Sequence, residues 1–247
     1  MSRLPHPART LRRRLREERG FTLIEMLIAT LAGIIVTAAM GAIMIVTVHF
    51  SSNVNDRVDA NQEGRVAMEK ITQALNSSCV AAGVTPIQAG SDWNHLIFYS
   101  ALADTPAINP NLLEVELTGG SLTMLTNDWV SGTGPTGSSG WSFSPTVNST
   151  FTLLPYATNE TVNSASVPVF QYYGYGSNGA LTTNLDPTDT TLTAATAAQV
   201  AEVVITFESF PSYNWNATGR AADIADSVVL RLTPASDQST ATNAPCS

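Results

Sequence analysis

A long uncharged and apolar segment constrains this chain more than any other feature. From Met26 to Phe50 no residue carries a formal charge, and Leu, Ile, Val, Ala and Met predominate. The run of about 25 residues exceeds the roughly 20 that a helix needs to cross a bilayer. In lipid such a segment must satisfy its own backbone hydrogen bonds, which a helix does. The sequence therefore predicts a membrane-spanning helix.

One acidic residue, Glu25, stands at the head of this run. A carboxylate near the apolar core of a bilayer costs about 2.5–3.5 kcal/mol on insertion scales, and such residues are usually functional. If Phe21 were an N-terminus, its amine would lie one helical turn from Glu25. That amine, or the amine of a neighbouring chain, could neutralise the acid. The alternative is a glutamate at the edge of an ordinary signal anchor.

The charge of the chain is strongly asymmetric. Residues 1–20 hold seven arginines and two glutamates, which gives +5, whereas the whole chain carries −8 and the part from Phe21 onward therefore −13. Because positive segments stay in the cytoplasm, the leader is expected inside and the C-terminal body outside. A basic leader could also be a nucleic-acid-binding arm. Since phosphate binding needs positive charge and the body is acidic, no nucleic-acid partner is indicated.

The stretch Arg19–Thr30 (RGFTLIEMLIAT) resembles the N-terminus of type IV prepilins and pseudopilins. In that family a membrane-embedded aspartyl peptidase cuts after the glycine, and the new N-terminal residue, usually Phe, is methylated. The resemblance implies cleavage after Gly20, N-methylation of Phe21 and an assembly role for Glu25, which would pair with the amine of a neighbouring subunit. The implied partners are other pilin or pseudopilin subunits, the prepilin peptidase and the inner-membrane assembly platform.

After Phe50 the helix is predicted to continue as an amphipathic segment to about residue 79. Apolar residues recur mostly at offsets of three or four, and charged residues occupy the other positions. The predicted buried residues are Val54, Val58, Met68, Ile71 and Leu75, and Asn76-Ser77-Ser78 is the predicted stop.

Glycines interrupt this predicted helix, and no proline lies between Phe21 and Cys79. Gly33, Gly41 and Gly64 are weak points at which the helix could bend. For Gly33 and Gly41 close packing of helices is an equally good interpretation, because small residues let backbones approach.

Residues 80–247 have the composition of an exported β-rich domain. Predicted strands come from alternating or β-branched runs, and Gly119-Gly120 reads as a hairpin turn between two of them. The strands are Trp93–Tyr99, Leu112–Leu117, Leu122–Leu125, Val167–Tyr173, Val200–Phe207 and Ser227–Leu232. The predicted connections are Ser131–Gly140, Thr182–Thr193 and Pro211–Ala225.

The expected fold class is thus α+β and pilin-like, with a long N-terminal helix packed on an antiparallel β-sheet. The expected organisation is a basic leader (1–20) removed by the peptidase, a transmembrane or filament-core helix (21–50), its amphipathic continuation (51–79) and an extracytoplasmic β-rich domain (80–247).

Two further segments are similar to one subgroup of this family, the minor pilins and pseudopilins of the PilW and pseudopilin J type. They are the helical Gln62–Met68 and the aromatic, glycine-containing Val167–Leu181. The second segment also has glycines 174, 176 and 179 in the spacing of a dinucleotide-binding loop. That loop requires a helix directly afterwards, and no helical period follows, so the glycines indicate a hairpin turn.

The two cysteines, Cys79 and Cys246, are predicted to form a disulfide, because an even pair in an exported protein usually does. The bond would close a loop of roughly 170 residues and stabilise by at most about 5 kcal/mol in the chain-entropy model. Two reduced thiols are the alternative.

Catalytic and metal-binding patterns find little support. Neither a G-x-S-x-G turn nor an H-E-x-x-H pair occurs, and His95 is interpreted as a hydrogen-bonded structural residue. The pairs Asp186/Asp189 and Asp223/Asp226 could donate oxygens to calcium, but solvated loop acids are the preferred interpretation. We expect no enzyme activity, no cofactor and no metal site.

Three aromatic residues near Gly- or Asn-rich loops, Trp141, Tyr213 and Trp215, could be adhesive, although packing in the core is the preferred interpretation.

The sequence predicts a structural subunit, a minor pilin or pseudopilin of a type IV pilus or a type II secretion-like filament. It would be a single-pass cytoplasmic membrane protein before it enters a surface filament or pseudopilus. The body is larger than that of a typical major pilin, which favours a low-copy tip or priming role. The alternative is a permanently membrane-anchored surface protein with a binding or adhesive ectodomain.

Overall fold

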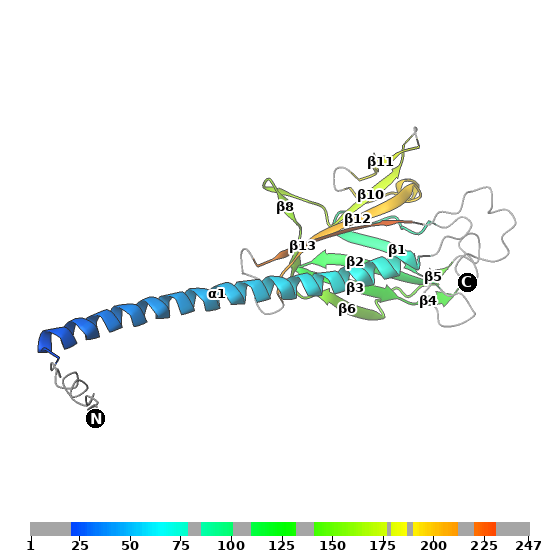
Figure 1. The fold of residues 1–247 in the computed structure, drawn as a ribbon. Helices are drawn as coiled ribbons and strands as arrows, with labels where there is room; N and C mark the ends of the chain where they lie inside the picture. The colour runs from blue at the N-terminus through cyan, green and yellow to red at the C-terminus, as the bar shows by residue number, and fades with distance from the viewer. Residues whose placement is uncertain are drawn as a thin grey trace, which may run out of the picture. The chain divides into compact units, whose positions relative to one another are not determined.

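The computed structural model describes residues 21–78, 85–100, 110–131, 141–176, 179–186, 190–211 and 220–230. The chain divides into two compact units that meet between Ser52 and Asn53, and each unit is described by itself. The first contains the apolar half of the long helix, and the second contains the rest of that helix together with all strands (Figure 1).

Helix α1 spans Leu23–Asn76 without interruption. It continues through Gly33, Gly41 and Gly64, so none of these glycines breaks it. Its end falls in the predicted stop, where the Ser77 amide donates to the carbonyls of Gln73 and Ala74. The Ser77 and Ser100 hydroxyls lie 2.9 Å apart and connect the end of α1 to a strand.

The first sheet of the second unit is a meander of four antiparallel strands. In spatial order they are β1 (His95–Ser100), β2 (Asn111–Thr118), β3 (Ser121–Asn127) and β6 (Ser149–Leu154). Gly119 and Gly120 join β2 to β3 with φ of +61° and +82°, which favours glycine at both positions. This confirms the hairpin turn predicted from the sequence.

The second sheet contains β12 (Val200–Ser209), which has the largest share of buried residues among the described strands. The spatial order is β11 (Leu181–Asn184), β10 (Phe170–Tyr175), β12 and β13 (Ala222–Val229), and the short β7 (Ala157–Thr158) also pairs with β12. Strands β10 and β11 pair antiparallel, which confirms that the three glycines of this region belong to a hairpin.

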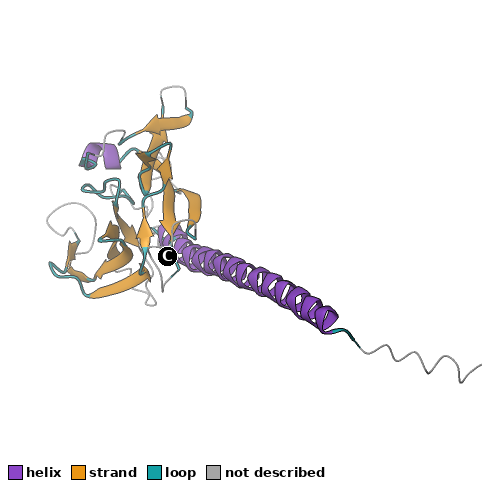
Figure 2. Cartoon of the chain, turned by 90° about the vertical axis from the view of Figure 1, so that its left-hand side faces the viewer, coloured by secondary structure: helices purple, strands orange, loops and turns teal. Residues whose placement is uncertain are grey.

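Short elements complete the second unit (Figure 2). Strand β4 (Trp129–Ser131) pairs with β5 (Ser142–Phe143), and β8 (Thr161–Val162) pairs with β9 (Ala165–Ser166). The single-turn helix α2 (Ala194–Ala197) begins with a reciprocal capping box between Thr193 and Thr196.

One hydrophobic core joins α1 to both sheets. Half of the buried residues of α1 are alanine or glycine, which lets the strands approach its backbone. The buried residues of α1 are Asp56, Ala60, Gly64, Ala67, Met68, Ile71, Ala74 and Leu75. At Gly64 an added Cβ would lie 2.6 Å from Ile224 Cγ1 and 3.1 Å from Ser209 Cβ. Gly64 is therefore a close-packing position.

Part of the predicted helix face was wrong. Met68, Ile71 and Leu75 are buried, whereas Val54 and Val58 are about half exposed. At this end of the buried face the helix turns Asp56 and Ala60 inward instead. Small and charged residues do not register in a pattern of large apolar residues, so the periodicity placed this end of the face two positions away.

The β-rich domain differs from the prediction in three respects. It contains two main sheets rather than one. Strand β13 begins at Ala222, inside the predicted connection Pro211–Ala225, and β11 overlaps the first three residues of the predicted connection Thr182–Thr193. Strand β6 was missed because its Ser, Thr and Phe residues are mostly exposed and show no alternation of burial.

Candidate functional site: the first turn of α1 and the helix face beyond it

The first turn of α1 is built by a threonine cap. Thr22 accepts the Glu25 amide at both its carbonyl oxygen (3.0 Å) and its hydroxyl oxygen Oγ1 (3.3 Å). The order Thr22-x-x-Glu25 is that of a capping box, in which a hydroxyl at the N-cap meets the third helical residue. Thr22 was not singled out from the sequence, although this spacing is the signal that could have found it.

Glu25 lies on the exposed surface of the apolar half of α1. An acid in the first turn of a helix also interacts favourably with the positive end of the helix dipole. Phe21 precedes the helix with 73% of its surface exposed. Gly20, the predicted cleavage position, lies outside the described residues. The predicted pairing of Glu25 with the amine of a neighbouring chain stays a prediction.

The hydroxyls of the apolar half are satisfied within the helix. Thr30, Thr37 and Thr47 donate to the carbonyls of Leu27, Gly33 and Ile43, each at 2.9 Å. Because every one of these donors has an acceptor in its own helix, the segment presents few unsatisfied polar groups to an apolar environment. Within the described residues α1 is the one helix whose length and composition allow it to cross a membrane.

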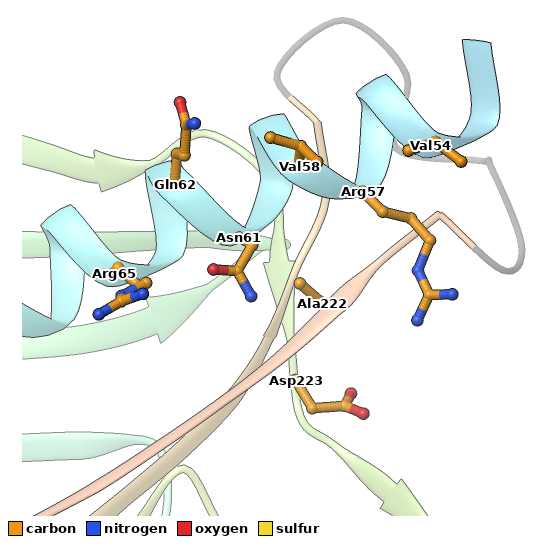
Figure 3. A pocket seen from close by; sticks show the side chains of 8 residues that line it. All are labelled: Val54, Arg57, Val58, Asn61, Gln62, Arg65, Ala222 and Asp223. Carbon is orange, nitrogen blue, oxygen red and sulfur yellow. The ribbon is translucent and has the colours of Figure 1, made fainter. Parts of the chain in front are cut away.

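Beyond residue 52, α1 and β13 form a groove of about 690 Å³. Its lining comes from one face of α1 and from the start of β13 (Figure 3), and consists of Val54, Arg57, Val58, Asn61, Gln62, Arg65, Ala222 and Asp223. Figure 3 shows Arg57 and Asn61 pointing from the helix to the side on which Ala222 and Asp223 lie. This groove cannot be found from the sequence of the helix alone, because it depends on a strand about 160 residues further along the chain.

A buried ion pair is formed by Asp56, which lies between the groove residues Val54 and Arg57 in the sequence of α1. Asp56 is 2% exposed and its carboxylate lies 2.6 Å from the guanidinium of Arg220. Arg220 lies just before β13, so the pair fastens the entry of that strand to the helix. The burial of Asp56 is explained by this partner, because a buried charge needs a hydrogen-bonded counter-charge.

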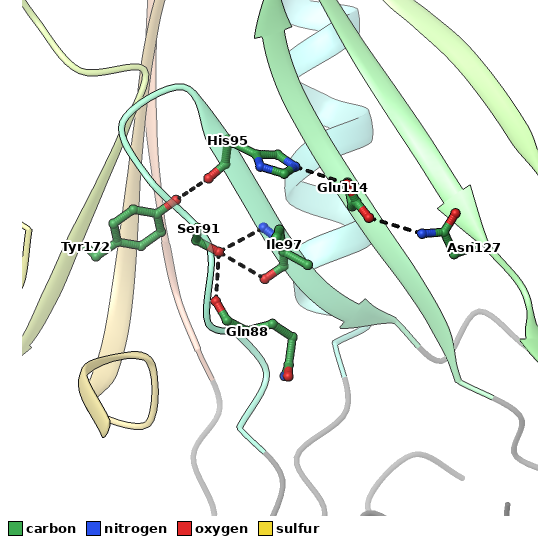
Figure 4. A network of polar contacts seen from close by, with 7 residues as sticks. All are labelled: Gln88, Ser91, His95, Ile97, Glu114, Asn127 and Tyr172. Atoms are coloured by element: carbon green, nitrogen blue, oxygen red, sulfur yellow. Dashed lines mark hydrogen bonds and ion pairs between the residues drawn. The ribbon is translucent and has the colours of Figure 1, made fainter. Parts of the chain in front are cut away.

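His95 has the hydrogen bond that was predicted for it. Its Nε2 lies 3.1 Å from Glu114 Oε2, and the other oxygen of Glu114 accepts from the Asn127 amide at 3.0 Å (Figure 4). The three residues belong to β1, β2 and β3 in that order and tie these strands together. The Ser91 hydroxyl donates to the carbonyl of Gln88 and accepts from the amide of Ile97, so this side chain is held by the main chain.

Tyr172 links the two sheets. Its hydroxyl lies 2.9 Å from the carbonyl oxygen of Asp92 and 3.0 Å from that of His95. Burial raises the pKa of the Tyr172 phenol well above its ordinary value, and the carboxylates of Asp92 and Asp186 raise it further, whereas a hydrogen bond with Ser91 lowers it. The side chain is therefore a neutral structural tyrosine.

The candidate calcium acids lie in two different settings. Asp186 is buried, and its Oδ1 accepts from the amide and the hydroxyl of Thr190, so the expectation of a solvated loop acid was wrong there. Asp189 lies outside the described residues. Asp223 and Asp226 are exposed as expected, but on strand β13 rather than in a loop.

Strand geometry separates the second of these pairs. Because side chains alternate along a strand, residues 223 and 226 point to opposite faces. Among the described residues, no group of three or more His, Cys, Asp or Glu side chains could hold a metal ion.

Of the predicted aromatic and cysteine positions, one lies among the described residues and the others do not. Trp141 packs edge-on against Tyr99 with ring centroids 5.6 Å apart, in agreement with a packing role. Tyr213, Trp215 and both cysteines of the predicted disulfide, Cys79 and Cys246, lie outside the described residues.

Comparison with known proteins adds no relative to these observations. The chain matches no protein-family model, and no curated protein is significantly similar to it.

Proposed function

We propose that this protein is a subunit of a type IV pilus or a type II secretion-like filament, of the minor-pilin or pseudopilin kind. The observation that carries the proposal is the composition of α1. One helix joins a fully exposed apolar half, with a single acid in its first turn, to a second half that packs into a β-rich body. An apolar surface of this size needs cover from lipid or from other chains.

The role of Glu25 in this proposal follows from its position. After cleavage between Gly20 and Phe21, the new ammonium group would lie at the same end of the helix as the carboxylate. In an apolar filament core an unpaired carboxylate is costly, so a subunit would be held where an amine of its neighbour meets Glu25. The acid would thus select the axial position of one helix relative to the next.

Analysis of the mature N-terminus tests this proposal. Intact-mass and N-terminal measurements on protein from its native membrane should show a chain that begins at Phe21 and carries one methyl group. Cells that lack the prepilin peptidase should accumulate the chain from Met1. If the shortened form persists in those cells, or if wild-type cells contain only the chain from Met1, the proposal is wrong.

The alternative from the sequence is a permanently anchored surface protein with a binding or adhesive ectodomain. This alternative predicts that wild-type cells contain only the chain from Met1. Such a protein would keep Met1 and its basic leader in the cytoplasm. The same measurement therefore separates the two functions.

A further inference from the structure

The groove between α1 and β13 is lined by two arginines for which the described residues supply no counter-ion. Arg57 and Arg65 both line it, and neither has a carboxylate within 4.0 Å among the described residues. The other described basic side chains of the second unit are engaged, since Arg220 pairs with Asp56 and the Lys70 ammonium lies 3.7 Å from the Phe151 ring centroid. The chain from Phe21 onward has a net charge of −13, so two arginines in one groove with no ion pair among the described residues stand out from its acidic composition.

The spacing of the arginines limits what can bind both. They are eight residues apart, which corresponds to about 12 Å along a helix. Along an extended chain, side chains four residues apart point to the same side and are about 13 Å apart. Two carboxylates with that spacing would meet one arginine each, with the Asn61 amide between them.

The charges on the two walls of the groove determine which wall an acidic ligand would contact. Asp223 on β13 adds a negative charge opposite the helix, so an acidic ligand is drawn toward α1 rather than toward the strand. Val54 and Val58, each about half exposed, offer apolar contacts at the same face. Charged and apolar groups side by side are typical of surfaces that bind a peptide segment.

We infer that this groove, lined by Arg57, Asn61 and Arg65, binds an extended acidic segment of a different subunit in the same filament. The inference rests on the proposed function for the identity of the partner, whereas the chemistry of the partner follows from the groove itself. Arginine suits this role because its planar guanidinium binds carboxylates with two parallel hydrogen bonds.

Photocrosslinking in cells that produce the full chain and its assembly machinery tests the inference. Benzoylphenylalanine introduced in place of Asn61 should form an adduct with another subunit, at a segment that carries acidic residues. The double variant Arg57→Glu/Arg65→Glu should reduce this adduct at least fivefold. Lys70→Glu, a charge reversal elsewhere on the same helix, should change it less than twofold. Benzoylphenylalanine in place of the exposed Gln73 controls for random collisions.

Rescue by exchange of charges decides between binding and misfolding. Changing the two acidic residues of the crosslinked segment to lysine should restore the adduct with the Arg57→Glu/Arg65→Glu variant. The inference is overturned if no adduct forms, if the adduct is a lipid or a second copy of this chain, or if charge reversal leaves it unchanged.

N-terminal analysis of the same samples keeps the two proposals apart. If the chain still begins at Met1 but the charge-dependent adduct forms, the proposed function fails and the chemistry of the groove stands. If the chain begins at Phe21 but the adduct ignores the charges, the groove inference alone fails.

Discussion

At the scale of single residues, the second unit depends on a position where a side chain is absent. Gly64 brings α1 so close to β13 that a Cβ would lie 2.6 Å from Ile224 Cγ1. Glycine in the interior of a helix costs about 1 kcal/mol relative to alanine. That cost is offset here by contact between the helix backbone and the strand.

We therefore predict that Gly64→Ala destabilises the protein by about 1–3 kcal/mol, the usual cost of overpacking. Urea unfolding of the full chain in a nonionic detergent, followed by tryptophan fluorescence, measures the change. Gly33→Ala is the matched control, because nothing lies within 4 Å of its added Cβ. Ile224→Ala should recover part of the loss in the double variant. A Gly64→Ala protein as stable as the wild type would contradict the packing described above.

A second residue-scale prediction concerns Glu208 on β12. Desolvation by burial, followed by the charges of Asp223 and Glu160, raises its pKa above the ordinary value of 4.5. The folded state therefore holds this proton more tightly than the unfolded state. The resulting stability is present at low pH and is lost as the pH rises through the folded-state pKa.

Glu208→Gln removes the ionised form, so the variant should be more stable than the wild type near pH 7. The difference should shrink as the pH falls below the ordinary glutamate value. Unfolding free energies measured across this pH range give the test, and Asp223→Asn should act in the same direction because it removes one repelling charge. A constant difference between variant and wild type at all pH values would refute the assignment to Glu208.

At the scale of elements, the entry of β13 is held to α1 by the pair Asp56–Arg220. The two partners are unequal, since the side chain of Arg220 is 30% exposed and that of Asp56 only 2%. Removal of one partner leaves the other without its counter-charge, and the consequence depends on how much water that partner reaches.

We predict that Arg220→Met destabilises more than Asp56→Ala, because it leaves a carboxylate buried without a partner. The expected loss is about 3–5 kcal/mol for Arg220→Met, as for other broken buried pairs. Asp56→Ala leaves a guanidinium that water can solvate and should cost less. Denaturant unfolding of both single variants and of the double variant measures the coupling. Equal losses in the two single variants would show that burial does not control this pair.

Local elements could be read from the sequence where the signal is local. The alternation of Glu114 and Glu116 with apolar neighbours predicted β2, and Gly119-Gly120 predicted the turn after it. Features that depend on contacts between distant parts of the chain were not predicted. Asp56 is buried because Arg220, 164 positions away, reaches it. The groove at Arg57 and Arg65 likewise exists only because β13 lies beside α1.

At the scale of the whole molecule, the sequence predicted those parts of the candidate site that depend only on the order of residues along one helix. Glu25 and the apolar run were identified without structure, because their meaning comes from their positions along one helix. The two arginines of the groove were not identified, since their lack of a counter-ion among the described residues depends on which side chains the fold brings near them.

Glu25→Ala supplies the prediction at this scale. Under the proposed function the variant should still be cut after Gly20, because Gly20 and Phe21 are unchanged, yet its incorporation into filaments should fall at least tenfold. Immunoblots of sheared filaments and of membranes compare the two pools. Lys70→Arg, outside the groove lining, serves as a control that keeps all charges. Normal incorporation of Glu25→Ala would remove the assembly role assigned to this acid.

The internal bonding of Thr30, Thr37 and Thr47 has a consequence for the energetics of relocation. Each hydroxyl carries its acceptor with it, so exchanging acyl chains for protein side chains breaks none of these bonds. Both surroundings are similarly apolar, and the swap itself releases little free energy. Net movement of the apolar half of α1 out of the bilayer would then have to be driven by external work. Without such work, its entry into the bilayer and its exit would be about equally favourable.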